Sequence, residues 1–152
     1  MKVRIEIDPE AVEPEVLIRC AEITADIGRL QRLMSQVSSE GVKLAFHKGN
    51  DEYYFPLAAV LFFESSGDAI YAHTRDDDFQ VRQRLYELED QLPADFVRIS
   101  KSCIVNTRQI YAIERNLASS SQVRFTGSHK TVYVSRRYYG ACKARMEARL
   151  GS

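Results

Sequence analysis

Two short polar segments near the C-terminal end carry the residues with the clearest chemistry. The first, Ser100-Lys101-Ser102, separates the apolar runs 96–99 and 103–105. Its hydroxyls and backbone amides could bond phosphate oxygens, while the ammonium group adds positive charge. A plain polar turn between two buried strands is the alternative interpretation.

The second segment, Ser135-Arg136-Arg137, stands where a helix is predicted to begin. Positive side chains are unfavourable there because the start of a helix is the positive end of its dipole. A bound phosphate would reverse that effect by pairing with the free amides and both guanidinium groups. A guanidinium can also reach guanine O6 and N7 in a major groove. The alternative is that one arginine pairs with an acid from the middle of the chain.

A third segment, Ser65-Ser66-Gly67-Asp68, has the composition of a tight hairpin turn. Alone it indicates only a turn. It becomes a candidate phosphate contact if it lies beside the two basic segments.

Motifs for catalysis or metal binding are not found in the sequence. His47, His73 and His129 have no metal-ligand spacing, and no metalloprotease, serine-hydrolase or P-loop motif occurs. Asp76-Asp77-Asp78 lacks the pattern of a calcium loop and predicts a solvated turn. Cys103 lies in an apolar strand, which favours inert packing over a reactive thiol. We therefore expect no catalytic residue, no metal site and no cofactor.

Charge is balanced in total and unequal along the chain. The 152 residues contain 21 Lys and Arg and 21 Asp and Glu. Residues 96–152, however, hold eleven basic residues and only two acids, Glu114 and Glu147. If this final third folds onto one side, the surface is polarised and suits phosphate backbones. The alternative is that the charge is spread around the surface.

The first 40 residues are interpreted as an N-terminal appendage to the main domain. Val3, Ile5 and Ile7 alternate with charged residues and predict a strand, and 16–20 predict a second one. Thr24 is a candidate helix N-cap. The following helix has an apolar stripe that we expect to pack on the domain or form a dimer contact, made of Ile27, Leu30, Met34 and Val37.

Residues 41–152 predict a second unit, mainly β with short helices (α+β). Alternation predicts strands around residues 42–46 and 53–57. Apolar runs and turns predict strands at 60–63, 70–74, 96–99, 103–105, 110–113, 122–126 and 130–134. Val81, Leu85, Leu88 and Leu92 predict one helix face, and a last helix follows Ser135.

The location is expected to be cytoplasmic. Three widely spaced cysteines, the lack of an apolar leader and the lack of a membrane-length apolar run all favour this interpretation.

Five segments in this order resemble the LytTR DNA-binding domain of bacterial response regulators. They are YYFPL at 53–57, VLFFES at 60–65, LYELEDQLP at 85–93, FVRISKSCIVN at 96–106 and VSRRY at 134–138. The resemblance covers residues 42–146, about two-thirds of the chain.

The resemblance implies an elongated, mostly antiparallel β fold whose loops, rather than a helix, enter successive major grooves of duplex DNA. It assigns DNA contacts to Ser66, Gly67, Ser100, Lys101, Ser102, Ser135, Arg136 and Arg137. The family usually has histidine where this chain has Ser100, which removes one donor. At the hairpin tip, Asp68 would be repelled by phosphate, so Ser66 or Gly67 is the better contact.

The expected function is that of a stand-alone, response-regulator-like transcriptional regulator, because 40 residues are too few for a receiver domain. It would bind paired DNA sites as a homodimer, and a membrane-bound inhibitory protein is a further expected partner. The alternative is a protein-interaction or signal-sensing module that has kept the fold and lost DNA binding. An enzyme is not expected.

Overall fold

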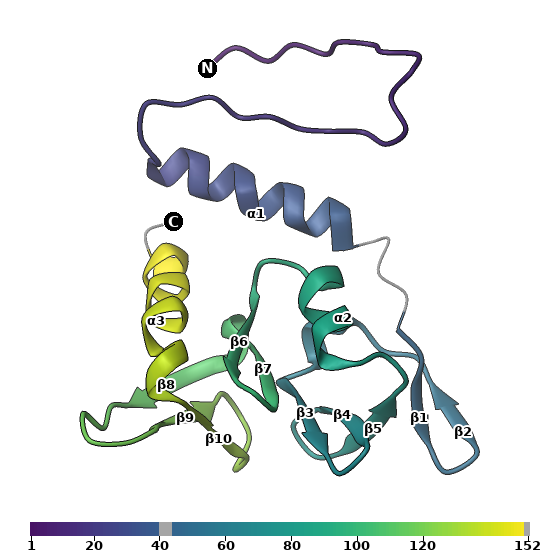
Figure 1. Ribbon diagram of the computed structural model, residues 1–152, viewed down its shortest axis with the longest axis vertical. Coiled ribbons are helices and arrows are strands. Elements are labelled where there is room, and N and C mark those ends of the chain that lie inside the picture. Colours follow the sequence, from purple (N-terminus) through teal and green to yellow (C-terminus); the bar gives the residue numbers. More distant parts are fainter. Residues whose placement is uncertain (40–43, 151–152) are drawn as a thin grey trace.

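The protein consists of an N-terminal segment, a helix lying across the domain, and a β-rich domain with two further helices (Figure 1). The computed structural model describes the backbone of residues 1–39 and 44–150, and the side chains of 1–34 and 44–149. The helices are α1 (Ala25–Ser39), α2 (Leu85–Gln91) and α3 (Arg136–Leu150), with 3-10 turns η1 (Leu57–Ala59) and η2 (Thr107–Gln109).

The strands form two antiparallel sheets. The larger has the order β2-β1-β5-β4-β3-β7-β6, and the smaller has the order β10-β9-β8. The larger contains β1 (Phe46–Lys48), β2 (Asp51–Tyr53), β3 (Phe62–Ser66), β4 (Ala69–His73), β5 (Asp78–Val81), β6 (Phe96–Ser100) and β7 (Cys103–Asn106). The smaller contains β8 (Ile110–Glu114), β9 (Ser121–Phe125) and β10 (Thr131–Val134). This is the predicted mainly β fold with short helices.

The middle of the larger sheet is buried on both faces, which explains its continuous apolar sequence. On β3, Phe63 belongs to a core cluster with Leu85 and Leu88 of α2. The neighbouring Phe62 belongs to a second cluster, which includes Val123 of β9 and Cys142 of α3. The two cores hold β3 and β7 rigidly between α2 and the smaller sheet.

The prediction that Val81 belongs to a helix is wrong. Val81 ends β5, where it pairs with Ile70 of β4. Residues 78–81 alternate between exposed and buried, which is the period of a strand. The spacing from Val81 to Leu85 fits a helix face by coincidence, and Asp78 is a strand residue rather than part of a turn.

The predicted strand at 53–57 is also wrong beyond its first residue. β2 ends at Tyr53, and η1 starts at Leu57 after Pro56, which has no N–H to donate to a ladder. Phe55 is still packed inward, stacked on Phe46 with 4.1 Å between ring centroids. The strand predicted around 42–46 begins only at Phe46, and residues 42–43 lie outside the described chain.

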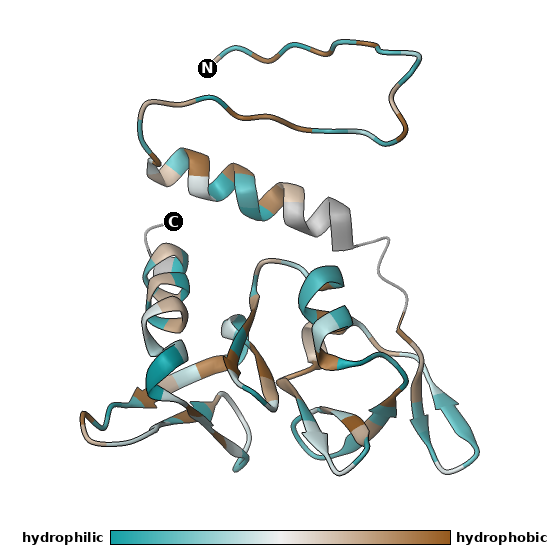
Figure 2. Ribbon diagram, viewed as in Figure 1, coloured by the Kyte–Doolittle hydropathy of each residue, from teal (hydrophilic) through white to brown (hydrophobic). Residues whose placement is uncertain are grey.

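Neither predicted strand of the N-terminal appendage is formed. Residues 1–24 have no strand pairing, and the segment runs extended beyond α1 (Figure 1). The alternation of apolar and polar residues is visible along it in Figure 2. A strand needs a partner backbone for its N–H and C=O groups, and among the described residues no backbone pairs with this segment. The predicted unit boundary at residue 40 lies outside the described chain.

Helix α1 begins as predicted, because the Thr24 hydroxyl accepts a hydrogen bond from the Ile27 N–H at 3.5 Å. Arg32 of α1 donates to the Arg149 carbonyl of α3 at 3.3 Å. Of the predicted stripe, Ile27 and Leu30 are half-buried and Met34 is 41% exposed. The Val37 side chain lies outside the described residues. No helix in the described part of the chain is long and apolar enough to cross a membrane.

Candidate nucleic-acid interface

The three segments singled out in the sequence meet at one edge of the protein. The Ser65 N–H donates to the Ser102 carbonyl at 2.8 Å, which joins the β3–β4 hairpin tip to the β6–β7 turn. The Ser135 N–H donates to the Ile99 carbonyl at 2.9 Å, which joins the same turn to the start of α3. The β6–β7 turn therefore lies between the other two segments.

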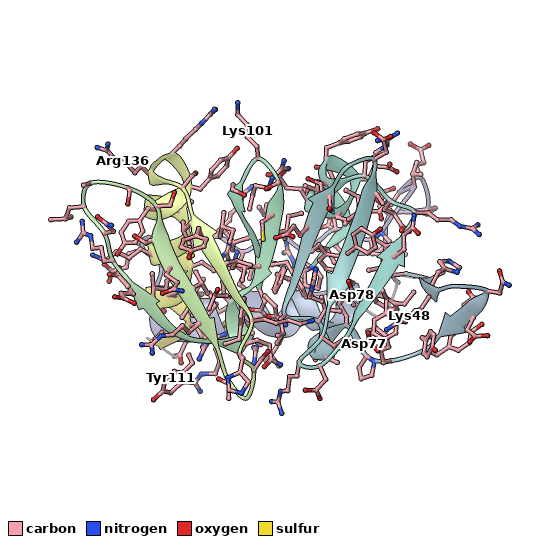
Figure 3. The ribbon with its side chains drawn as sticks, turned by 90° about the horizontal axis from the view of Figure 1, so that it is seen from below. Lys48, Asp77, Asp78, Lys101, Tyr111 and Arg136 are labelled. Carbon is pink, nitrogen blue, oxygen red and sulfur yellow. The ribbon has the colours of Figure 1, made fainter. Side chains whose placement is uncertain are left out.

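We call this surface the basic edge. It consists of Ser66, Gly67, Ser100, Lys101, Ser102, Ser135, Arg136 and Arg137. Figure 3 shows Lys101 and Arg136 projecting from it in the same general direction, whereas Lys48, Asp77 and Tyr111 lie toward the opposite edge. In the part of the chain that the structure describes, the exposed cations Lys101, Arg136 and Arg137 form no ion pair. They are free to attract an anion.

A β-bulge directs the β6–β7 turn outward. The register between the two strands shifts between Arg98 and Ser100, so Ile99 is the extra residue. Its side chain is fully buried, and Cys103 on the other arm of the turn is also buried. Two anchored side chains thus fix the base of the turn while Lys101 at its tip stays exposed.

Arg98 braces this turn, a role that was not predicted from the sequence. Its Nε donates to the Ser100 carbonyl at 2.7 Å and its Nη2 donates to the Lys101 carbonyl. Its Nη1 pairs with Glu89 of α2 at 2.9 Å. The guanidinium donates to two carbonyl oxygens whose partial negative charge would otherwise repel phosphate. A lone arginine between apolar residues of a strand was the only signal for this role.

The two serines of the turn have different surroundings. Ser100 is half-buried, and its hydroxyl accepts a hydrogen bond from the Ser102 N–H at 3.2 Å and lies 3.3 Å from the Ser102 hydroxyl. Ser100 therefore shapes the turn, while Ser102 is exposed and accessible to a ligand.

The hairpin tip depends on a glycine. Gly67 has a φ of +60°, a left-handed conformation that other residues adopt at a cost. A Cβ at this position would meet no atom within 4 Å, so the tip is open to solvent. Asp68 beside it is exposed and acidic, which leaves Ser66 and Gly67 as the better partners for an anion.

Helix α3 starts with two arginines and has no acid in its first turn. The Arg137 guanidinium lies 5.7 Å from the ring centroid of Tyr138. Its side chain is thus oriented by a cation–π contact while its charge stays exposed. The placement expected from the sequence is confirmed, and no acid of the middle block pairs with either arginine in the described residues.

A further arginine, Arg82, extends the basic edge and was not predicted from the sequence. Val81 pairs with Ile70 at the end of β5, which places the next residue, Arg82, beside the β3–β4 tip. Arg82 and Arg84 are both exposed. The incorrect assignment of Val81 to a helix hid this position.

The basic final third of the chain is only partly gathered at this edge. Arg108 pairs with Asp95 at 2.7 Å, and Lys130 donates to the Asp77 carbonyl near the opposite edge. Arg124 is exposed near the β9–β10 turn. The charge count allowed either a basic patch on one side or basic charge spread around the surface. Each alternative holds for part of this segment.

Cys103 is buried and Asp77 is paired, whereas Cys20 is a free, exposed thiol. Burial raises the pKa of the Cys103 thiol well above its usual range, and the inert packing expected for it is confirmed. A hydrogen bond from Lys48 lowers the pKa of Asp77, and the two side chains form an ion pair. Among the described residues, no group of three or more His, Cys, Asp or Glu could hold a metal ion.

Comparison with known proteins identifies the same family that the sequence resembles. Residues 51–147 match the family described as the LytTr DNA-binding domain. Two uncharacterized HTH-type transcriptional regulators of Staphylococcus aureus, from strains RF122 / ET3-1 and NCTC 8325 / PS 47, are 40% and 39% identical over 93 residues. The match covers 59% of this chain and 60% of each of these relatives.

A solved structure described as a LytTr DNA-binding domain from Bacillus cereus has a TM-score of 0.62 and 25% sequence identity. It matches over 70% of this chain and 98% of its own length. The relatives are named as HTH-type, yet strands β6 to β10 separate α2 from α3 here. The described residues of this β-rich domain therefore contain no helix-turn-helix.

Proposed function

This chain belongs to the LytTr DNA-binding domain family, and from that premise we propose that its basic edge binds duplex DNA to regulate transcription. The protein acts in the cytoplasm, as a homodimer on paired sites. The observation that carries the proposal is the junction of three candidate contact segments by two backbone hydrogen bonds.

The shape of the edge suits reading by loops. Two turns and the first residues of a helix project from it, and each is anchored by buried residues behind it. Protruding segments of this size enter a major groove, where arginine forms paired hydrogen bonds with guanine. We assign base reading to Arg136 or Arg137 and phosphate contact to Lys101, which is a point charge at the tip of its turn.

The dimer is assigned to the apolar stripe of α1, made of Ile27, Leu30, Met34 and Val37. Exposed apolar side chains of the N-terminal segment also suit a membrane-bound inhibitory protein as a second partner. Both assignments concern the part of the chain outside the basic edge, so they leave the DNA contacts accessible.

Two alanine variants test the assigned contacts. Arg137→Ala is expected to weaken binding to the preferred sequence by about 1–3 kcal/mol and to relax specificity. Lys101→Ala is expected to weaken binding to all sequences alike and to reduce the slope of log K against log salt by about one. Fluorescence anisotropy with duplexes selected from random DNA measures both effects. No binding by the parent protein at low salt would favour a module that has lost DNA binding.

A further inference from the structure

The N-terminal segment Lys2–Asp8 exposes an unusual amount of apolar surface. Val3, Ile5 and Ile7 are 85%, 87% and 87% exposed, and the segment forms no strand pairing in the described chain. Among the described residues, 2–7 form no backbone hydrogen bond, while the Asp8 carbonyl at the end of the segment accepts one from the Ala11 N–H at 3.1 Å. Such a segment is a template for pairing with another strand.

The sequence of this segment is complementary to itself when two copies run antiparallel. If the register is centred on Ile5, Lys2 faces Asp8 and Arg4 faces Glu6 of the second copy. Val3 then faces Ile7, and Ile5 faces Ile5. Side chains directly opposite each other in an antiparallel pair are close enough to interact, and opposite charges there are favourable.

We propose that residues Lys2–Asp8 form a two-stranded antiparallel ribbon with the same residues of a second copy of this chain. The ribbon has one charged face, on which every residue meets its opposite charge, and one apolar face. It supplies a dimer contact for the function proposed above and can be tested without DNA.

The surroundings of the segment fit this pairing. Val3 and Ile5 line an open hollow together with Val16, Leu17 and Met34, so part of the apolar face has side chains to pack on. Met34 belongs to the stripe of α1, which connects the ribbon to the helix assigned to the dimer. Within one copy, the Arg4 Nη2 and Glu6 Oε2 atoms lie 3.7 Å apart, and both side chains are strongly exposed. In the ribbon, each would pair with the opposite charge of the second copy instead.

A second strand of the same chain fits less well. Residues 15–19, which run back past the segment (Figure 1), contain three consecutive apolar residues rather than an alternating pattern. Pro14 also lacks an N–H where such a hairpin would continue. The second copy is therefore the better partner.

Charge reversal tests the register. Arg4→Glu places glutamate opposite Glu6 in both halves of the ribbon, and Glu6→Arg places arginine opposite Arg4. Each variant alone is expected to raise the dimer dissociation constant roughly ten- to a hundredfold, because two favourable pairs become repulsive. Mixing the two variants restores opposite charges at both positions, as does combining both changes in one chain.

Sedimentation velocity over a range of concentrations measures the outcome, with Arg19→Glu as a control outside the register. The expected result is a dimer for the parent, the control, the equimolar mixture and the double variant, and a shift toward monomer for each single variant. A monomeric parent, unaffected single variants or a mixture that stays monomeric would each overturn the proposal. Dimerisation without DNA binding would leave this pairing intact and contradict only the proposed function.

Discussion

At the scale of single residues, four arginines of the β-rich domain fall into two pairs that differ in their partners. Arg98 and Arg108 are held by carboxylates and carbonyl groups, and they stabilise turns. Arg136 and Arg137 have no acidic partner in the described chain, although they stand where a helix dipole disfavours them. The sequence identified the second pair from that unfavourable placement. It could not distinguish the first pair, because a brace depends on which carbonyls the fold brings near.

Arg98→Lys tests the brace without changing the net charge. A lysine has no planar fork, so it cannot hold the Ser100 and Lys101 carbonyls together. We expect the free energy of unfolding to fall by about 1–2 kcal/mol and DNA affinity to fall several-fold, as measured by chemical denaturation and anisotropy.

The matched control is Glu89→Gln, which removes only the exposed ion pair and should cost about 1 kcal/mol or less. Equal DNA affinities for Arg98→Lys and the parent would show that the turn does not need the brace.

His73 is a residue whose protonation opposes folding. It is stacked on Phe62, its Nδ1 lies 3.2 Å from the Lys130 ammonium, and burial followed by Lys130 lowers its pKa. The unfolded chain, with the ordinary value near 6.5, takes up a proton first as pH falls. The resulting stability is fully present above the unfolded pKa and decreases below it.

We therefore expect the free energy of unfolding to decrease between about pH 7.5 and pH 5.5 and to decrease less in His73→Gln. Denaturant titrations at several pH values provide the comparison. Parallel pH profiles for the two proteins would show that His73 is not the responsible group.

At the scale of elements, local periodicity was sufficient to predict a strand or helix where one face of that element packs against a core. The β6, β7, β9 and β10 strands and helix α3 were predicted close to their observed positions for that reason. Val81 was misassigned because a spacing of four residues fits both the end of a strand and the start of a helix. The first N-terminal strand was misassigned because alternation shows a capacity for pairing and gives no information about a partner. The second was misassigned because a short apolar run gives no such information either.

The β3–β4 hairpin offers a test of turn geometry. Gly67→Ala should lower the free energy of unfolding by about 1 kcal/mol, because an alanine must adopt a positive φ with no compensating contact. Gly67→Asn should cost less, since asparagine tolerates this conformation better. Thermal or chemical denaturation of the three proteins decides the order, and a stabilised alanine variant would contradict the assigned turn.

At the scale of the whole molecule, the zero net charge conceals an uneven surface. The basic edge carries Lys101, Arg136 and Arg137, with Arg82 alongside, while the opposite edge pairs Lys48 with an aspartate. Charge counts along the sequence suggested this asymmetry. They could not locate it, since strands run between the two edges and place neighbouring basic residues at opposite ends.

The most direct test compares duplex DNA binding by the parent and by the triple variant Lys101→Ala, Arg136→Ala, Arg137→Ala. The probe is a duplex that the parent selects from random DNA. Arg124→Ala, an exposed arginine near the β9–β10 turn, is the control. We predict that the triple variant binds at least about a hundredfold more weakly while the control retains nearly full affinity. Equal affinity of the triple variant and the parent would contradict the proposal that this edge contacts DNA.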